Sequence, residues 1–345
     1  MKRVLNFSMM LCITAATAFA QSAQSVKIVK AAKGNRIDVF IGGKPFTSFL
    51  YPDTVEKPVL YPIHAADGNT ITRGFPVNPK PGDPTDHPHH LGLWLNYENL
   101  NGLDFWNNSY AIPANKKDQY GWIRTDKIVE TKSGTTGVLA YHANWTDRQK
   151  NVIVEETTRY IFSGNSHQRI IDRITTLKAD TKAVFKDAKD GMLGLRVAHE
   201  LQMPTTKDQS FTDDKGNVTV VKGGTDAIPT GNYLTSAGKT GNDAWSTRGV
   251  WCKMYGKMGH DSISIAIIDH PENPNYPTFW HARDYGLFAA NPLGEKIFTN
   301  GKSEKNLTLE KGESVTFKYR IVIQNGAKTP TSAELNKMAK TFAGK

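Results

Sequence analysis

The chain has 345 residues, a formal net charge of +10 and two cysteines. So few cysteines exclude a disulfide framework, and the length is sufficient for a substantial hydrophobic core. The Lys and Arg residues are scattered rather than gathered in a run, so we expect a solvated basic surface and no nucleic-acid partner.

The first twenty residues have the pattern of a secretory signal peptide. Lys2 and Arg3 precede an apolar stretch that closes on the small-x-small site Ala18-Phe19-Ala20. This stretch is too short to span a bilayer, and no later segment is long and apolar enough to do so. We therefore predict cleavage near Ala20, a periplasmic or secreted location and no membrane insertion. The mature chain would carry a charge of +8 and one cysteine, Cys252.

The first half of the mature chain predicts short β-strands separated by turns. Strands are expected over Ser25–Lys30, Arg36–Ile41, Phe46–Tyr51, Pro58–His64, His89–Tyr97, Leu103–Trp106, Gly121–Lys132, Gly137–Asp147, Val152–Phe162 and Gln168–Leu177. A long loop rich in proline and glycine, from Gly68 to Asp86, interrupts them. Loops of this length are uncommon in compact domains and are often functional.

The second half continues in the same way. Strands or hairpins are expected over Leu193–Gln202, Gly249–Tyr255, Ser262–Asp269, Thr278–Ala290, Asn306–Leu309 and Ser314–Gln324. Residues 205–245 read as a polar excursion, and a helix is expected over Thr331–Phe342, with Thr331 or Ser332 as its N-cap. Roughly fifteen strands and one short C-terminal helix predict an all-β fold. We expect a large antiparallel β-sandwich, supersandwich-like, as a single domain over residues 21–345.

The segment Asp86-His87-Pro88-His89-His90 places three of the ten histidines within four positions. In an extended chain, His87 and His89 would share one face and His90 would take the other. That spacing suits metal ligation, and it makes His87 and His89, with His199, candidate ligands of a divalent metal ion. Neutral imidazole is also the usual acid–base group near pH 7, and His90 is the candidate for that role. The alternative is a structural cluster bonded to carbonyls or to Asp86.

A second unusual segment is Trp280-His281-Ala282-Arg283-Asp284-Tyr285. Trp280 and Tyr285 offer flat faces for stacking on sugar rings, and Arg283 offers hydrogen bonds to hydroxyls or a carboxylate. His281 and Asp284 are candidates for proton transfer. The alternative is that the two aromatic residues belong to the core and that Arg283 and Asp284 form a structural ion pair.

Four further residues are weaker candidates. On a strand, His199 and Glu200 point to opposite faces, so only one of them enters a given cleft. Glu200 is a candidate general base, and a plain surface carboxylate is the alternative. His64 ends a strand just before the long loop, and Arg73 within that loop is a candidate clamp for an anion.

These stretches and their spacing resemble a family called PmoA-like, or methane oxygenase, otherwise a domain family of unknown function. The resemblance rests on Lys57–Pro62, Asp86–Trp94, Asn101–Trp106, Gly194–Ala198, Trp280–Gly286 and Phe288–Pro292. Where the family often has arginine after the two adjacent histidines, this chain has Leu91. The methane monooxygenase subunit of similar name is a multi-span membrane protein, so the absence of a predicted span argues against that activity. The association of the family with polysaccharide-degrading bacteria points to sugars.

The end of the chain, Leu309–Phe317, also resembles the last hairpin of galactose-mutarotase-like sandwiches. Together these features favour an exported carbohydrate-active enzyme that uses histidine and carboxylate acid–base chemistry. A lyase, a hydrolase and an epimerase all remain open, and a divalent metal ion is a candidate cofactor. The alternatives are a sugar-binding protein without catalysis and a metal-binding protein without turnover. If the site is shared, the His87–His90 and His281–Asp284 segments must lie close together in the fold.

Overall fold

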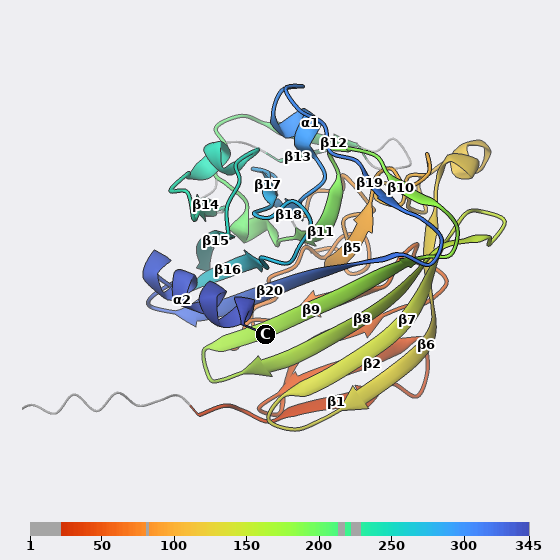
Figure 1. Cartoon of the computed structure of the whole chain (residues 1–345). Coiled ribbons are helices and arrows are strands. Elements are labelled where there is room, and N and C mark those ends of the chain that lie inside the picture. Colours follow the sequence, from red (N-terminus) through yellow and green to blue (C-terminus); the bar gives the residue numbers. More distant parts are fainter. Residues whose placement is uncertain (1–21, 81–82, 213–217, 222–228, 345) are drawn as a thin grey trace, which may run out of the picture.

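The computed structural model describes residues 22–80, 83–212, 218–221 and 229–344. The predicted signal peptide therefore lies outside the described residues. These described residues contain twenty strands, most of them in two large sheets that face each other (Figure 1). The prediction of a large antiparallel β-sandwich is confirmed.

The first sheet has eight strands, and every pairing in it is antiparallel. Its order across the sheet is β1 (Val26–Lys30), β2 (Arg36–Ile41), β3 (Lys44–Leu50), β4 (Val59–Ile63), β5 (Leu93–Tyr97), β11 (Gly191–Arg196), β18 (Leu287–Asn291) and β17 (Phe279–Ala282). Segments far apart in the sequence therefore become neighbours at β5, β11 and β18.

The second sheet also has eight strands and is antiparallel throughout. Its order is β14 (Asn232–Thr235), β15 (Trp251–Met258), β16 (Asp261–Asp269), β20 (Ser314–Gly326), β9 (Gln168–Ala179), β8 (Val152–Gly164), β7 (Gly137–Thr146) and β6 (Trp122–Lys132). Two antiparallel pairs of short strands among the described residues stand outside these sheets: β10 (Ala183–Phe185) with β19 (Leu307–Leu309), and β12 (Gln209–Thr212) with β13 (Val218–Val221).

The main core lies between the two sheets and follows from the alternation of side chains along each strand. Leu93 and Leu95 of β5 face it, as do Leu193 and Leu195 of β11, and all four are at most 1% exposed. Cys252 is also buried in this core and is a free thiol, as expected. No helix of the described residues is long and apolar enough to cross a membrane.

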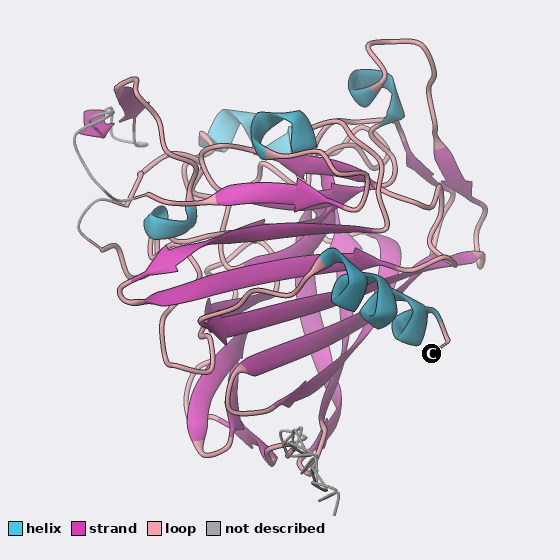
Figure 2. Ribbon diagram, turned by 90° about the vertical axis from the view of Figure 1, so that its left-hand side faces the viewer, coloured by secondary structure: helices cyan, strands magenta, loops and turns pink. Residues whose placement is uncertain are grey.

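Helix α2 (Ser332–Ala343) covers the outer face of the second sheet (Figure 2). Its apolar residues Leu335, Ala339 and Phe342 pack against strand residues that include Trp251. Thr331 is the N-cap, and a reciprocal capping box with Glu334 satisfies the first free N–H groups. The short elements are α1 (Glu295–Phe298) and the 3-10 turns η1 (Ala114–Gln119), η2 (His199–Leu201) and η3 (Gly241–Ala244).

The strand predicted over His89–Tyr97 begins only at Leu93. Residues 87–90 form a turn instead, closed by a hydrogen bond of 2.9 Å from the His90 N–H to the His87 carbonyl. His87 has a φ of 46° and Gly92 one of 59°, so neither residue is extended. A Cβ on Gly92 would lie 2.2 Å from the Leu60 carbonyl oxygen, so this position requires a residue without a side chain.

Two further strand predictions were wrong in part. The strand expected over Leu193–Gln202 ends at Arg196, and His199 and Glu200 lie in the turn η2. Leu103–Trp106 is not a strand and makes only isolated bridges. In both places the chain leaves the sheet and continues in a loop that covers the sheet. The local alternation of apolar and polar residues does not show where a strand ends in this way.

Candidate functional site

The candidate site lies on the outer face of the first sheet, opposite the main core. Side chains on this face come from the alternate positions Trp94 and Asn96 of β5 and Gly194 and Arg196 of β11. A Cβ on Gly194 would lie 2.4 Å from the Trp94 ring, so this glycine makes room for an indole above the strand. The loop that runs from β4 to β5 covers this face of the sheet, so Trp94, Asn96 and Arg196 are buried between the sheet and the loop.

Asp86 forms the centre of a buried ionic network. The Arg196 guanidinium donates to both of its carboxylate oxygens at 2.9–3.2 Å, and Arg73 donates to one of them at 2.9 Å. Both arginine side chains are 0% exposed. Burial disfavours ionisation of Asp86, but the hydrogen bond from His87 and the charges of Arg196 and Arg73 outweigh it, so the pKa of Asp86 lies well below its ordinary value.

The anion that Arg73 binds is the protein's own Asp86 carboxylate. Its Nη1 and Nη2 groups also donate to the backbone carbonyls of Pro84, Asp86, His87 and His90 at 2.7–3.2 Å. Burial and the charge of Arg196 lower the pKa of Arg73 to about 9, which leaves it charged at neutral pH. Arg73 therefore holds the turn of residues 87–90 in place and has no donor directed at solvent.

His87 is the exposed member of this network. Its Nδ1 forms a short hydrogen bond with the Asp86 carboxylate, which fixes the proton on Nδ1 and leaves Nε2 as the free ring nitrogen. Its ring is parallel to the His90 ring at 4.8 Å and to the Tyr285 ring at 5.3 Å, so it is held between them. Its side chain is still 42% exposed. A carboxylate-bound, sandwiched and accessible imidazole is arranged for proton transfer.

Of the other two histidines of the segment, His90 is buried and His89 is half-buried. His90 is 1% exposed, accepts a hydrogen bond from Arg196 at its Nδ1 (3.1 Å) and stacks on Trp94. Burial lowers the pKa of both His89 and His90 well below the ordinary value. The prediction that His87 and His89 share one face, apart from His90, was wrong, because the rings of His87 and His90 are stacked in a turn.

The metal-ligand set His87, His89 and His199 is not formed. Across residues 22–80, 83–212, 218–221 and 229–344, no three His, Cys, Asp or Glu side chains are grouped so that they could hold a metal ion. His199 lies in η2, where its Nδ1 is 3.2 Å from the Gln202 side-chain oxygen. Because Asp86 engages Nδ1 of His87, that nitrogen is also unavailable to a metal.

The second predicted segment meets the first, as the shared-site hypothesis required. Tyr285 stacks on His87, and the guanidinium of Arg196 lies 4.8 Å from its ring centroid. The Arg283 guanidinium lies 5.6 Å from the same ring. Protein groups thus already pack against the Tyr285 ring, so it is not the free platform for a sugar that was expected. Burial raises the pKa of Tyr285 to about 12, so its hydroxyl stays protonated.

Trp280 does not reach the site. It is 0% exposed and faces the main core between the sheets, so the alternative assignment to the core is the correct one. His281, the next residue on β17, takes the opposite face and enters the site. The backbone N–H of Tyr285 donates to the Asp284 carboxylate at 2.9 Å, an interaction within the β17–β18 turn.

Sequence analysis missed Asp190, which lies beside His281. Its carboxylate oxygen is 3.4 Å from His281 Nδ1, and its backbone N–H donates to Glu98 at 2.9 Å. Burial and the neighbouring charge of Glu98 raise the pKa of Asp190 to about 6. Burial, together with the charges of Arg283 and Lys189, lowers the pKa of His281 to about 3, so that imidazole is neutral. Asp190 directly precedes Gly191 and β11, a position that carries no signal in the sequence.

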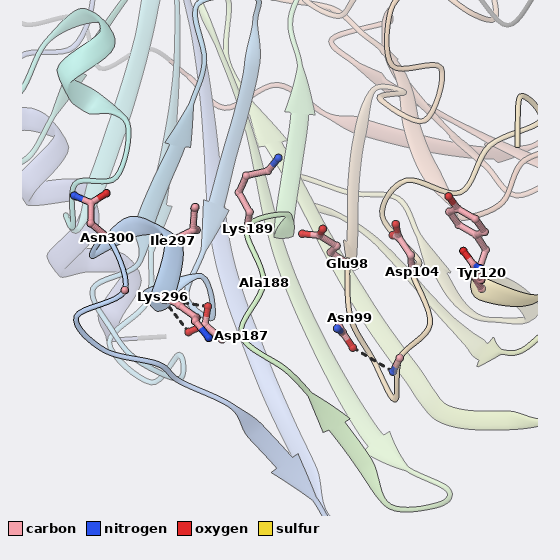
Figure 3. Close-up of a pocket in the computed structure, with 13 residues that line it drawn as sticks. Glu98, Asn99, Asp104, Tyr120, Asp187, Ala188, Lys189, Lys296, Ile297 and Asn300 are labelled. Atoms are coloured by element: carbon pink, nitrogen blue, oxygen red, sulfur yellow. Dashed lines mark hydrogen bonds between the residues drawn. The ribbon is translucent and has the colours of Figure 1, made fainter. Parts of the chain in front are cut away.

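A polar cavity of about 760 Å³ is lined by Lys189, the residue before Asp190, and by Glu98, which accepts the Asp190 N–H (Figure 3). Asp104, Tyr120, Asp187 and Lys296 also line it. Burial and the charge of Glu98 also raise the pKa of Asp104, although hydrogen bonds from Asn107 oppose the shift. The cavity is large enough for a small ligand and rich in hydrogen-bonding groups.

Two other candidates lie apart from these residues. His64 lines a separate depression with Arg36 and Asp38, and its Nδ1 lies 3.2 Å from the Thr70 hydroxyl. The Glu200 carbonyl in η2 accepts a hydrogen bond from the Thr230 N–H at 3.0 Å, but its carboxylate makes no contact with His87 or Asp190 among the described residues.

Comparison with known proteins gives a family and distant structural neighbours. Residues 36–340 match a family model described as a family of unknown function (DUF6807). No curated protein matches the chain. Among solved structures, the GH36 α-galactosidase AgaB from Geobacillus stearothermophilus aligns over 88% of this chain and 41% of its own, with 11% identity and a TM-score of 0.41. The Slr1438 protein from Synechocystis sp. PCC 6803 aligns over 94% and 100%, with 9% identity and a TM-score of 0.31.

This chain therefore spans about two-fifths of the length of the galactosidase. Both similarities are too distant to carry an argument about function.

Proposed function

The chain belongs to the DUF6807 family of unknown function, and we propose from the geometry of its site that it is an acid–base enzyme acting on a sugar or glycoside. Export through residues 1–20 and membership of the PmoA-like group are parts of the same proposal. Asp190 accepts a proton from the substrate or from water, and His87, when both of its ring nitrogens are protonated, delivers the Nε2 proton to an oxygen of the substrate.

The observation that carries the proposal is the pair of His87 and Asp190 on one face of the sheet. His87 is fixed by Asp86 and held between two rings, while Asp190 has a pKa of about 6 and follows Lys189, which lines the polar cavity. The segment from His281 to Tyr285 connects them, because Tyr285 stacks on His87 and His281 Nδ1 lies 3.4 Å from the Asp190 carboxylate. Two titratable groups in different environments are what acid–base catalysis requires.

The sugar assignment is supported by the chemistry of the cavity. Carboxylates, an ammonium group and amides line it, and these groups form hydrogen bonds with hydroxyls. Its volume of about 760 Å³ lies within the ~300–1,000 Å³ range of small-molecule sites. Glu98, Asp104 and Asp187 outnumber the two lysines of the cavity, so neutral sugars fit it better than acidic ones.

The test is turnover of a panel of neutral mono- and oligosaccharides and their aryl glycosides in D₂O, followed by NMR. Both hydrolysis or elimination products and deuterium incorporated at carbon would be detected. We expect one substrate class to react, and we expect His87→Gln and Asp190→Asn to lower the rate by ~10²-fold or more. Asp118→Asn, on the surface, is the matched control.

Binding without reaction would favour the second candidate, a non-catalytic sugar-binding protein. In that case saturable chemical-shift changes would appear with a sugar, and neither product nor deuterium would form. Wild-type rates in folded His87→Gln and Asp190→Asn variants would refute the assigned proton transfers. Thermal melting of each variant shows whether it is folded.

A further inference from the structure

Lys57 is a buried amine that the acid–base site does not use. It directly precedes Pro58 and β4, and the whole residue is 4% exposed. Its Nζ donates to the His89 carbonyl at 2.8 Å and lies 5.4 Å from the centroid of the Trp94 ring. No carboxylate within the described residues lies at ion-pair distance from it.

Such an environment destabilises the charged form of a lysine. A buried ammonium ion is normally matched by a carboxylate, because the loss of hydration is otherwise uncompensated. Here only the more distant charges of Glu56 and Asp104 oppose the effect of burial, and the pKa of Lys57 falls to about 8. A substantial fraction of the side chain is therefore a neutral, nucleophilic amine under physiological conditions.

Lys57 also lines a cavity of its own, of about 230 Å³. The walls are largely apolar and include Val59, Leu91 and Pro76, and the rim carries Val77 and Tyr110, which are 52% and 50% exposed. The volume is below the ~300 Å³ of the smallest typical drug-sized sites, so only a small molecule fits. Among the described residues that line this cavity, Lys57 is the one lysine.

The imidazole of His89 is a wall of the same cavity. Its Nε2 is buried and makes no hydrogen bond within the described part of the chain. Burial lowers the pKa of His89 well below the ordinary value, so the ring is neutral. The lysine and an uncharged imidazole thus line the same small, mostly apolar cavity.

We propose that Lys57 is a reactive amine that forms an imine with a small aldehyde or ketone entering this cavity. The neutral Nζ adds to the carbonyl carbon, and a proton moves from nitrogen to the oxygen to give a carbinolamine. The carbinolamine then loses its oxygen as water, and the C=N bond forms. Water that enters the cavity with the carbonyl compound relays these protons, and no oxidant or reductant is needed.

The proposal predicts selective reductive alkylation of Lys57. The full-length mature protein is treated at pH 7 with glycolaldehyde and cyanoborohydride, which traps an imine as a secondary amine, and each lysine is followed by peptide mass spectrometry. At that pH the neutral fraction of Lys57 is about 9%, against about 0.04% for an ordinary lysine. A less basic amine is also a weaker nucleophile, so we expect Lys57 to react at least about tenfold faster than exposed Lys189.

Two variants distinguish a reactive site from chance labelling. Val77→Trp fills the mouth of the cavity while keeping Lys57, so labelling of Lys57 should slow severalfold and that of Lys189 should not change. Lys57→Met should remove the fast reaction altogether in a protein that still melts cooperatively. Labelling of Lys57 that is no faster than that of exposed lysines, or that is unaffected by Val77→Trp, would overturn the proposal. Neither outcome depends on sugar turnover.

Discussion

Replacing Asp86 with Asn tests the buried network that holds His87. The asparagine keeps the shape of the side chain and removes its charge, which leaves the Arg73 and Arg196 guanidinium groups buried without a counter-ion. Both arginine side chains are 0% exposed, and that of Asp86 is 10% exposed. Removing one partner of a buried ion pair costs about 3–5 kcal/mol of the free energy of unfolding.

That loss converts into a measurable melting shift. With ~2.1 cal/mol/K per residue, the unfolding entropy of a chain of 345 residues is ~0.7 kcal/mol/K. A loss of about 3–5 kcal/mol of the free energy of unfolding therefore lowers the Tm by ~4–7 °C. Thermal unfolding followed by circular dichroism at pH 7 measures the shift.

Asp118→Asn is the control, because Asp118 pairs with Arg148 at the surface, where the two side chains are 66% and 44% exposed. Exposed pairs contribute little, so the control should melt within ~1 °C of the wild type. An Asp86→Asn protein that melts no lower than this control would refute the assignment of Asp86 as the anchor of the turn.

Three further predictions follow from the same contacts. The kcat/KM for the proposed reaction should fall as the pH drops through about 6, where Asp190 becomes protonated. Glu98→Gln should move this acidic limb of the pH profile to lower pH, because it removes a charge that raises the pKa of Asp190. An acidic limb that does not move would exclude Asp190 as the base. The pKa of Asp86 is lowered in the folded state, so its contribution to stability is complete above the unfolded value of ~3.9 and is lost as the pH falls toward the folded pKa. Urea melts between pH 2 and 7 should therefore show a shallower acid loss in Asp86→Asn than in the wild type, and parallel curves would contradict this. Thr331→Ala should cost about 0.5–2 kcal/mol through loss of the α2 cap, with Ser332→Ala as the control for helix propensity.

The candidate site was predicted in its location but not in its roles. The two unusual segments meet, as the stacking of Tyr285 on His87 shows. The alternation rule failed for the histidines because it assumes an extended chain, whereas residues 87–90 form a turn. His87, a candidate metal ligand, is instead bonded to Asp86, and Trp280, a candidate for sugar stacking with a core position as the alternative, lies in the core.

Asp190 and Lys57 could not have been assigned from their residue types. An aspartate before a glycine is common in turns, and a lysine before a proline is unremarkable. Their pKa values are shifted because other segments bury them and bring charges close. These effects depend on desolvation and on distance in space, and neither is encoded in the neighbouring residues.

The sequence by itself determined most of the strands, the all-β class and the capped terminal helix. Each of these rests on interactions over a few residues, such as the alternation of apolar side chains or the capping box between Thr331 and Glu334. Only the tertiary structure decided the site. Asp86 and Arg196 are 110 residues apart in the chain and become partners only because β11 pairs with β5. That pairing excludes water from their charges and leaves the edge of His87 exposed.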